Sequence, residues 1–223
     1  MPRERELQDK YFRLAKKEGY AARSAYKLLE IQERRHTIRP RHWVLDIGCA
    51  PGSWLQVVSK ICGSRGRVVG IDLSPVTIPD LENVRTIVGD AFKADPMDLL
   101  RAVNDSPGPT EVDDAGRDVR TADQFRRFDM VMSDMAPATT GTPTADHFRS
   151  VDCCRRVLAI SETVLEPGGN LIMKVFEGES YPELVKDCQK LFRDAKGLRP
   201  DAVREVSREI YILGFGYLAV SKK

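Results

Sequence analysis

The chain has 223 residues, of which 35 are Lys or Arg and 33 are Asp or Glu, giving a net charge of +2. With 42 % hydrophobic and 30 % charged residues, the composition is that of an ordinary globular protein, which excludes the disordered and fibrous classes. No apolar run approaches the ~20 residues that span a bilayer, so no membrane span is indicated. The cysteines and histidines form no C-x-x-C or H-E-x-x-H motif, so neither a disulfide framework nor a zinc site is indicated.

The first part of the chain is basic. Residues 1–42 contain 12 Lys/Arg and 6 Asp/Glu, a net charge of +6, which leaves −4 for the rest of the chain. A basic arm of this kind indicates a polyanionic partner. Because the opening MPRERELQDK lacks the apolar core of a secretory signal, we expect a cytoplasmic protein with reduced thiols.

Short apolar runs alternate with longer amphipathic ones. The apolar runs predict strands over 43–47, 67–72, 84–88, 128–134, 170–175 and 209–220. The amphipathic segments predict helices over 22–33, 53–61, about 95–103, 147–165 and 181–194. The first five strands are apolar almost throughout, as is typical of strands covered on both faces. The alternation therefore predicts an α/β fold with a doubly wound, mostly parallel sheet.

Two segments interrupt this alternation. The Pro-Gly-Gly run at 167–169 is expected to end a helix just before a strand. The segment 104–127 is rich in Asp, Gly and Pro and has no apolar periodicity. We interpret it as an acidic surface insertion rather than a linker, because the strand–helix pattern resumes directly after it. Residues 1–223 are therefore expected to form a single domain.

The turn after the first strand has features of a nucleotide site. Residues 46–54 read D-I-G-C-A-P-G-S-W, in which Gly48 permits close backbone approach and the following helix offers free N–H groups. Asp46 precedes this glycine, and Asp72 closes the second strand 24 positions after it. An acid at that place suits a ribose diol, because ligands of open α/β sheets bind beyond the carboxyl ends of the strands.

A third acid, Asp90, follows the third strand and could accept from an adenine amino group. The turn lacks the G-x-G-x-x-G of NAD-binding folds, and its flanking acids suit a cationic nucleoside, S-adenosylmethionine (SAM), better than a pyrophosphate. Each acid alone also has a structural explanation, with Asp46 capping a turn, Asp72 capping a helix and Asp90 lying in a loop. Acids at three successive strand ends favour the cofactor.

Four more polar side chains stand in or beside the predicted elements. Asp134 ends the fourth strand, Lys174 ends the fifth, Glu209 opens the last, and Lys27 lies in the first helix. A lysine inside an apolar strand is costly unless it is paired, so Lys174 indicates either a structural ion pair or a functional group. The pattern favours function for Lys174 and Asp134. Lys27 and Glu209 alone would be ordinary surface charges.

The motifs around these positions occur together in one known family. They are R-S-A-Y-K-L (23–28), the 46–54 turn, S-D-M-A-P (133–137), M-K-V-F-E-G (173–178) and S-R-E-I-Y (207–211). In this order they closely resemble the FtsJ/RrmJ family of SAM-dependent ribose 2′-O-methyltransferases, from about residue 10 to the C-terminus. The resemblance implies a Rossmann-like methyltransferase fold with an antiparallel C-terminal strand.

The same resemblance assigns site residues and includes no metal. It places the family's Lys-Asp-Lys-Glu tetrad on Lys27, Asp134, Lys174 and Glu209. It places the SAM contacts, beside Gly48 of the turn, on Gly52, Trp54, Asp72, Asp90 and Asp134. Two departures are Ser53, where the bacterial rRNA enzyme has glycine, and the insertion at 104–127.

Methyl transfer from a sulfonium to a ribose hydroxyl is an in-line displacement that a base assists, because a hydroxyl is a poor nucleophile. A lysine, with an ordinary pKa of ~10.4, serves as a base only when its proton is displaced, which desolvation and neighbouring positive charge favour. We hypothesise that Lys174 takes the 2′-OH proton, with Asp134 and Lys27 fixing its position. Glu209 would orient Lys27 and the incoming ribose.

Within the family, bacterial-type members modify a uridine of large-subunit ribosomal RNA, and related members modify the tRNA anticodon loop. The compact length, the short tail and the run S-D-M-A-P-A-T-T-G-T-P favour the ribosomal branch. In residues 1–42, cations that could track phosphates alternate with aromatics that could stack on bases or pack on the body. These are Arg13, Lys16, Lys17, Arg23, Arg34 and Arg35, with Tyr11, Phe12, Tyr20 and Tyr26.

We therefore expect RNA as the partner, with no membrane and no obligate protein partner. One alternative of another class is a non-catalytic RNA-binding protein with a methyltransferase fold, against which the intact tetrad counts. The other is an NAD-dependent oxidoreductase, against which the missing glycine and the absence of a Tyr/Lys proton relay count.

Overall fold

The described residues of the computed structural model are 2–79, 81–104, 121–202 and 207–219, with 2–9 described by their backbone alone. Their strands are β1 (Trp43–Ile47), β2 (Arg67–Asp72), β3 (Val84–Val88), β4 (Phe128–Ser133), β5 (Leu165–Phe176), β6 (Phe192–Leu198) and β7 (Glu209–Tyr217). Their α-helices are α1 (Pro2–Glu18), α2 (Ala25–Arg35), α3 (Ser53–Cys62), α4 (Pro96–Val103), α5 (Pro143–Val164) and α6 (Tyr181–Leu191), and a 3₁₀ turn covers Ala122–Gln124.

In the described part of the chain, seven strands form one sheet in the order β3-β2-β1-β4-β5-β7-β6. The first five strands pair in parallel, and β7 runs antiparallel to both β5 and β6. This confirms the predicted α/β fold, with its mostly parallel sheet and antiparallel C-terminal strand. β1, β2 and β3 have the predicted bounds.

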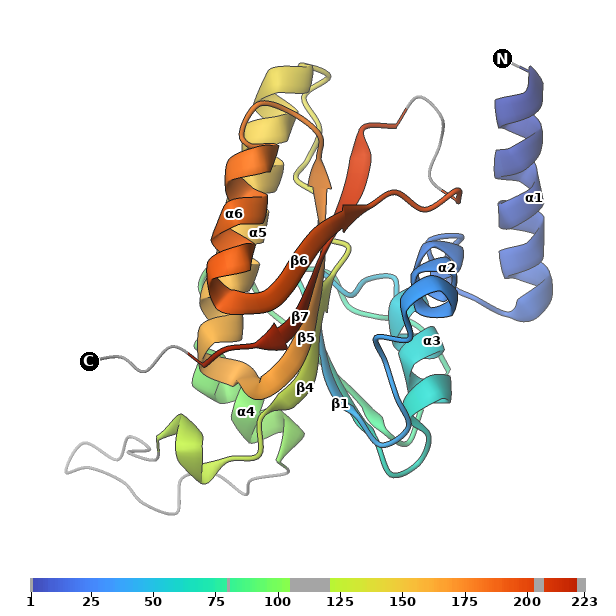
Figure 1. Ribbon diagram of the computed structural model, residues 1–223. Helices are drawn as coiled ribbons and strands as arrows, with labels where there is room; N and C mark the ends of the chain where they lie inside the picture. Colours follow the sequence, from blue (N-terminus) through green and yellow to red (C-terminus); the bar gives the residue numbers. More distant parts are fainter. Residues whose placement is uncertain (1, 80, 105–120, 203–206, 220–223) are drawn as a thin grey trace.

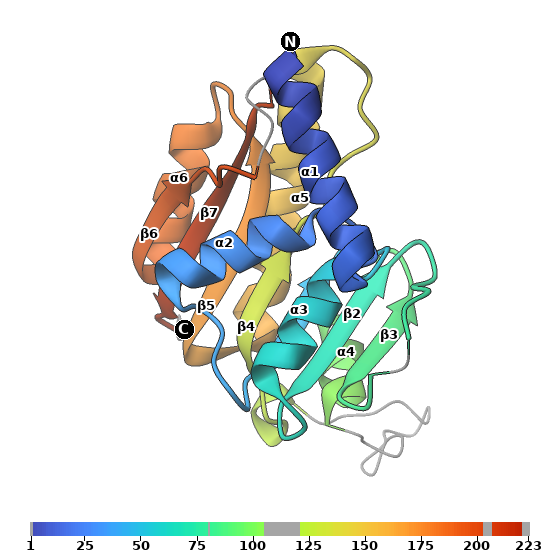
Figure 2. The same cartoon turned by 90° about the vertical axis from the view of Figure 1, so that its right-hand side faces the viewer.

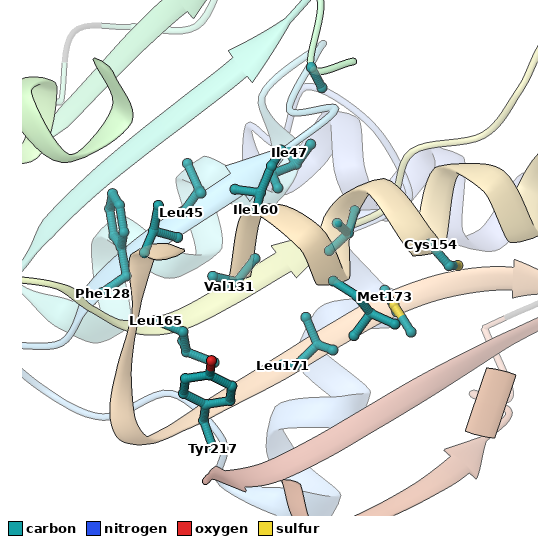
Figure 3. Close-up of a cluster of buried hydrophobic side chains, with 14 of the residues drawn as sticks. Leu45, Ile47, Phe128, Val131, Cys154, Ile160, Leu165, Leu171, Met173 and Tyr217 are labelled. Carbon is teal, nitrogen blue, oxygen red and sulfur yellow. The ribbon is translucent and has the colours of Figure 1, made fainter. Parts of the chain in front are cut away.

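Helices cover both faces of the sheet, α2 and α3 on one side and α4, α5 and α6 on the other (Figures 1 and 2). The larger core cluster lies on the side of α4 to α6, and Figure 3 shows part of it. Leu45, Val131 and Leu171 pair across β1, β4 and β5 and are fully buried. Burying each such side chain contributes about 1.5–3 kcal/mol. Burial on both faces explains why the central strands β1, β4 and β5 are rich in apolar residues, whereas the edge strand β3 is largely exposed.

The predicted junction between the helix over 147–165 and the strand over 170–175 is wrong. α5 starts earlier, at Pro143, and β5 follows the helix directly from Leu165. The Pro-Gly-Gly run at 167–169 lies inside β5, where the pairing with β4 shifts register. These breakers therefore mark an irregularity within the strand and do not separate it from the helix.

Two elements escape the sequence prediction. β6 takes the place of the end of the helix predicted over 181–194. Its buried residues, Phe192, Ala195 and Leu198, are spaced three apart, which imitates the period of a helix. Helix α1 precedes the first predicted helix and ends at Glu18, and the Gly19 that follows has a φ of 75°, a left-handed conformation that favours glycine.

Most of the predicted insertion at 104–127 falls on residues 105–120, outside the described part of the chain. Among the residues that are described, no helix is long and apolar enough to cross a membrane. Within the same residues, no group of three or more His, Cys, Asp or Glu side chains could hold a metal ion. The five cysteines are buried and carry free thiols.

Candidate active site

A pocket of about 540 Å³ opens at the carboxyl edge of the sheet. Its walls come from the turn after β1, the ends of β2 and β3, the loop after β4 and helix α5. β1 lies between β2 and β4, which is where the strand order switches direction. Loops diverge at such a point and leave the crevice in which open α/β sheets bind ligands. The volume is that of a small-molecule or cofactor site.

Glycine is required at two places in the turn after β1. Gly48 has a φ of 79°, and a Cβ there would lie 2.8 Å from the Cβ of Met135 in the loop after β4. Gly52 has a φ of 108°, and a Cβ there would lie 2.7 Å from Cγ1 of Val76. A side chain would prevent both approaches. Of these two predicted cofactor residues, Gly48 lines the pocket, whereas Gly52 caps α3 outside its lining.

Asp72 and Asp90, the predicted nucleoside partners, both line the pocket. The Asp72 carboxylate accepts hydrogen bonds from two backbone N–H groups at 2.8 and 3.0 Å, which fixes it at the end of β2. Asp90 accepts a hydrogen bond from the Phe92 N–H at 2.9 Å. Leu73 and Phe92 also line the pocket and are 72 % and 51 % exposed. Apolar side chains beside fixed carboxylates suit a flat base with a polar edge.

Asp46, in β1, carries a carboxyl group that is buried in the sheet. It is 1 % exposed, and neither side-chain oxygen has a hydrogen-bond partner among the described residues. Burial, and then the charges of Asp134 and Asp72, raise the pKa of Asp46 well above its ordinary value. An unsatisfied buried polar group costs about 1–3 kcal/mol, so this carboxyl indicates a site for a donor or a cation.

The charge of the pocket distinguishes two cofactor classes. Among the described lining residues, four are aspartates and one, Arg149, is a cation. A pyrophosphate would meet a net negative wall, whereas a sulfonium with an ammonium group would be attracted to it. Together with the buried carboxyl of Asp46, these side chains fit SAM and do not fit NAD.

The four predicted catalytic residues meet as two ion pairs. Lys174 Nζ lies 2.9 Å from Asp134 Oδ1 and donates to the backbone carbonyl of Asp134 at 2.5 Å. Lys27 Nζ, from α2, lies 2.5 Å from Glu209 Oε2. Asp134 also lines the pocket, so the Lys174–Asp134 pair adjoins the predicted cofactor site, whereas Lys174, Lys27 and Glu209 lie outside the lining.

The strand register explains how distant residues reach one place. In the antiparallel β5–β7 ladder, Lys174 pairs with Tyr211 and Phe176 pairs with Glu209. Side chains at alternate positions share a face, so Lys174, Tyr211 and Glu209 project to the same side of the sheet. Helix α2 packs on that side and brings Lys27 to it.

Tyr211 is a site residue that the sequence prediction did not assign. It is fully buried, and its hydroxyl donates to Asp134 Oδ1 at 2.7 Å. Burial tends to raise the pKa of Asp134, but the charges of Lys174 and Lys27, with the hydrogen bonds that Asp134 accepts, outweigh burial and hold that pKa below its ordinary value. The sequence did contain a signal that could have identified it: Tyr211 follows Glu209 by two residues in a predicted strand, so both side chains lie on the same face.

Trp54 connects the site to the N-terminal segment. It lies outside the lining of the main pocket but lines a smaller cavity of about 40 Å³ together with Asp46 and Asp134. Its indole N–H donates to the carbonyl of Ser24 at 2.9 Å. Ser53, the departure from the family, places its hydroxyl 2.8 Å from Ser24 Oγ. The serine therefore adds a contact between α3 and the start of α2.

Three of the four aromatics in the basic segment pack on one another. The ring of Tyr26 lies 5.2 Å from that of Tyr11 and 6.0 Å from that of Tyr20, measured between centroids. Lys60 Nζ lies 4.4 Å from the centroid of the Tyr20 ring. Phe12 is 64 % exposed. Of these four rings, Phe12 is the one most open to an RNA base.

Comparison with known proteins agrees with this geometry. A family model described as FtsJ-like methyltransferase matches residues 20–217. A ribosomal RNA large subunit methyltransferase E from Desulfatibacillum aliphaticivorans is 42 % identical over 207 residues, covering 93 % of this chain and 89 % of that protein. One from Pseudomonas fluorescens is 38 % identical over 216 residues, covering 96 % and 92 %. A crystal structure of a ribosomal RNA methyltransferase from Plasmodium falciparum matches with a TM-score of 0.70 at 24 % identity, over 89 % of this chain and 99 % of that one, and shows the fold.

Proposed function

The chain belongs to the FtsJ-like methyltransferase family, and on that premise we propose that it transfers the methyl group of SAM to a ribose 2′-hydroxyl of large-subunit ribosomal RNA. One observation carries the proposal: the Lys174–Asp134 and Lys27–Glu209 pairs meet beside a pocket lined by aspartates. Lys174 is held against Asp134, which lines that pocket, and a protein that only binds RNA has no need of a lysine inside a strand at this place.

The main pocket would hold the cofactor. Asp72 would accept hydrogen bonds from the ribose diol and Asp90 from the adenine amino group, with Leu73 and Phe92 against the base. Asp46 would supply the negative charge that the cationic end of the cofactor needs. These roles follow from the chemistry of the side chains that line the pocket, in which carboxylates outnumber cations.

Bound there, the cofactor would supply an electrophilic methyl group and a neutral thioether as the leaving group. Lys174, as the uncharged amine, would take the proton of the 2′-hydroxyl and so make the ribose oxygen a better nucleophile; the positive charges of the cofactor and of Lys27 would favour that uncharged form. The ammonium so formed is stabilised by Asp134, whose carboxylate lies 2.9 Å from Lys174 Nζ. Base assistance of this kind contributes about 10²–10⁴-fold to a rate.

The remaining groups position the reactants. Asp134 is held as a carboxylate by its neighbours, and Tyr211 fixes its orientation through the 2.7 Å hydrogen bond. Glu209 fixes Lys27 at the edge where the ribose would enter. Holding both reactants in line can lower a barrier by about 7–11 kcal/mol, so alignment supplies the larger share of the rate.

The basic segment 1–42 would bring RNA to the same edge. Lys16 and Lys17 are exposed on the last turn of α1, and the reactive Lys27 belongs to the same segment. The names of the relatives at 42 % and 38 % identity support ribosomal RNA over tRNA as the substrate. The uridine at the methylated position stays a prediction.

Transfer of radiolabel tests this function. The protein is incubated with SAM labelled on its methyl group and, separately, with in vitro transcribed large-subunit rRNA, assembled large subunits or tRNA. We expect one labelled nucleotide in the ribosomal substrates, with a phosphodiester that resists alkaline cleavage because its 2′-oxygen is methylated. Label in tRNA alone would establish the anticodon-loop alternative. SAM and RNA binding without any transfer would establish a non-catalytic RNA-binding protein.

A further inference from the structure

Arg156, which no sequence motif singled out, reaches from α5 to a turn beside the pocket. Its Nε donates to the carbonyl of Ala91 at 2.7 Å, and its Nη2 donates to the carbonyl of Ala94 at 2.7 Å. Its own helix also contributes to the pocket, because Asp152, one turn earlier on α5, lines it. A single guanidinium thus joins α5 to the segment between β3 and α4.

That segment forms the pocket wall that would face the base of the cofactor. Asp90 and Phe92 both line the pocket. The turn is closed by the N–H groups of Lys93 and Ala94, which donate to the Asp90 carbonyl at 2.9 Å. The Phe92 N–H donates to Asp90 Oδ1 at 2.9 Å, and Asp90 Oδ2 has the exposed Lys93 ammonium at 3.8 Å. These bonds set the shape of the turn, and Arg156 adds the link that sets its distance from α5.

The chemistry of the link explains why arginine occupies this position. A guanidinium is a planar fork whose N–H groups hold two acceptors at a fixed separation, whereas a lysine ammonium is a point charge on a flexible stem. Hydrogen bonds from a charged donor are also stronger than those between neutral groups. Because a hydrogen bond weakens steeply outside its narrow range of distance and angle, a small shift of the turn would misplace Asp90 against its ligand.

We propose that Arg156 is a positioning residue that sets the selectivity of the pocket for an adenine base, by holding Asp90 and Phe92 in place through Ala91 and Ala94. The inference rests on the proposed function, since it takes this pocket to be the cofactor site. Arg156 itself does not line the pocket, so its effect on selectivity passes through the turn.

Two ligands whose bases differ along one edge provide the test. S-adenosylhomocysteine carries the adenine amino group beside an unprotonated N1, and S-inosylhomocysteine carries a carbonyl oxygen beside a protonated N1. Their dissociation constants are measured by calorimetry for the wild type, Arg156→Gln, Arg156→Lys and Arg155→Gln. Arg155 is the matched control, because it is the neighbouring arginine on α5, is exposed, and lies 4.0 Å from Asp152.

We expect the wild type to bind the adenine ligand more tightly. In Arg156→Gln the ratio of the two dissociation constants should change about tenfold toward equal binding, which is the size of one well-made hydrogen bond. Arg156→Lys should show part of this change and Arg155→Gln none. The ratio of two affinities on one sample does not change when some of the protein is unfolded, so a purely structural role would leave it unchanged.

A wild-type preference retained in full by Arg156→Gln overturns the inference and leaves the proposed function standing. An equal loss in Arg155→Gln overturns it as well. If the wild type transfers methyl groups but does not distinguish the two ligands, the inference and the role of Asp90 fall together. If the wild type binds neither ligand and transfers no methyl group, the proposed function falls with them.

Discussion

Replacing Asp46 with Asn should stabilise the cofactor-free protein and weaken its binding of SAM. The Asp46 carboxyl is buried without a hydrogen-bond partner among the described residues. Burial, with the charges of Asp134 and Asp72, raises the pKa of Asp46 well above its ordinary value. The folded protein therefore keeps a proton on Asp46 at pH values where the unfolded chain, with a pKa of ~3.9, has lost it.

The direction and size of the effect follow from proton linkage. Over that range the folded state binds more protons than the unfolded state, so stability falls as pH rises. The contribution of the neutral carboxyl is complete below about pH 4 and is lost as pH rises to the folded pKa. One proton corresponds to at most about 1.4 kcal/mol per pH unit, or about 3–5 °C in Tm for a chain of this size. An asparagine side chain does not titrate. The stability of Asp46→Asn relative to the wild type should therefore increase with pH at that rate and level off above the folded pKa of Asp46.

Thermal unfolding from pH 5 to pH 8 measures this difference, with Asp152→Asn as the control for loss of an exposed carboxylate at the same pocket.

Calorimetry of SAM binding in two buffers of different ionisation enthalpy gives the second readout. A bound cation favours the ionised form of Asp46, so SAM binding to the wild type should release a proton, and Asp46→Asn should release less and bind about tenfold more weakly. Parallel Tm curves for the wild type and Asp46→Asn, with equal SAM affinity, would refute the reasoning.

Three further outcomes are expected. Gly178→Ala should lower the free energy of unfolding by about 1–3 kcal/mol in a urea titration, because the new Cβ would lie 2.4 Å from the buried His147 ring; an unchanged midpoint would show that the ring gives way freely. Glu209→Gln removes the charge that pairs with Lys27, so kcat should fall about tenfold or more while the Kd for SAM stays constant; a parallel loss of SAM affinity would contradict the assigned role. RNA affinity should fall steeply between about 50 and 200 mM salt while SAM affinity barely changes, and comparable slopes in filter-binding and calorimetric titrations would count against the basic segment as an RNA surface.

The cofactor half of the site was predictable because its signals are local. β1 and β2 are largely apolar runs, β3 is a short run in which three of five residues are apolar, and the predicted bounds of all three agree with the structure. Gly48, Asp72 and Asp90 follow those strands, and a parallel sheet brings its carboxyl ends to one edge. Lys174 stood out for the same kind of reason, as a charge inside an apolar segment.

What the sequence concealed depends on contacts between distant segments. Arg156 bonds to residues 62 and 65 positions away, and nothing in its own helix marks it. Tyr211 enters the site through the register of β7 against β5. Asp46 has no hydrogen-bond partner among the described residues because of the side chains that pack around it, which the local sequence does not reveal. β6 was hidden because its buried residues follow a spacing that helices also show.

The central claim is that Lys174 takes the proton of the ribose hydroxyl during methyl transfer. The most direct test is the single-turnover rate of Lys174→Met with SAM and RNA both bound at saturating concentration, on protein whose thermal unfolding shows that it is folded. With unchanged dissociation constants for both ligands, we expect this variant to methylate RNA about 10²–10⁴-fold more slowly than the wild type. A variant that binds both ligands and methylates at the wild-type rate would contradict it.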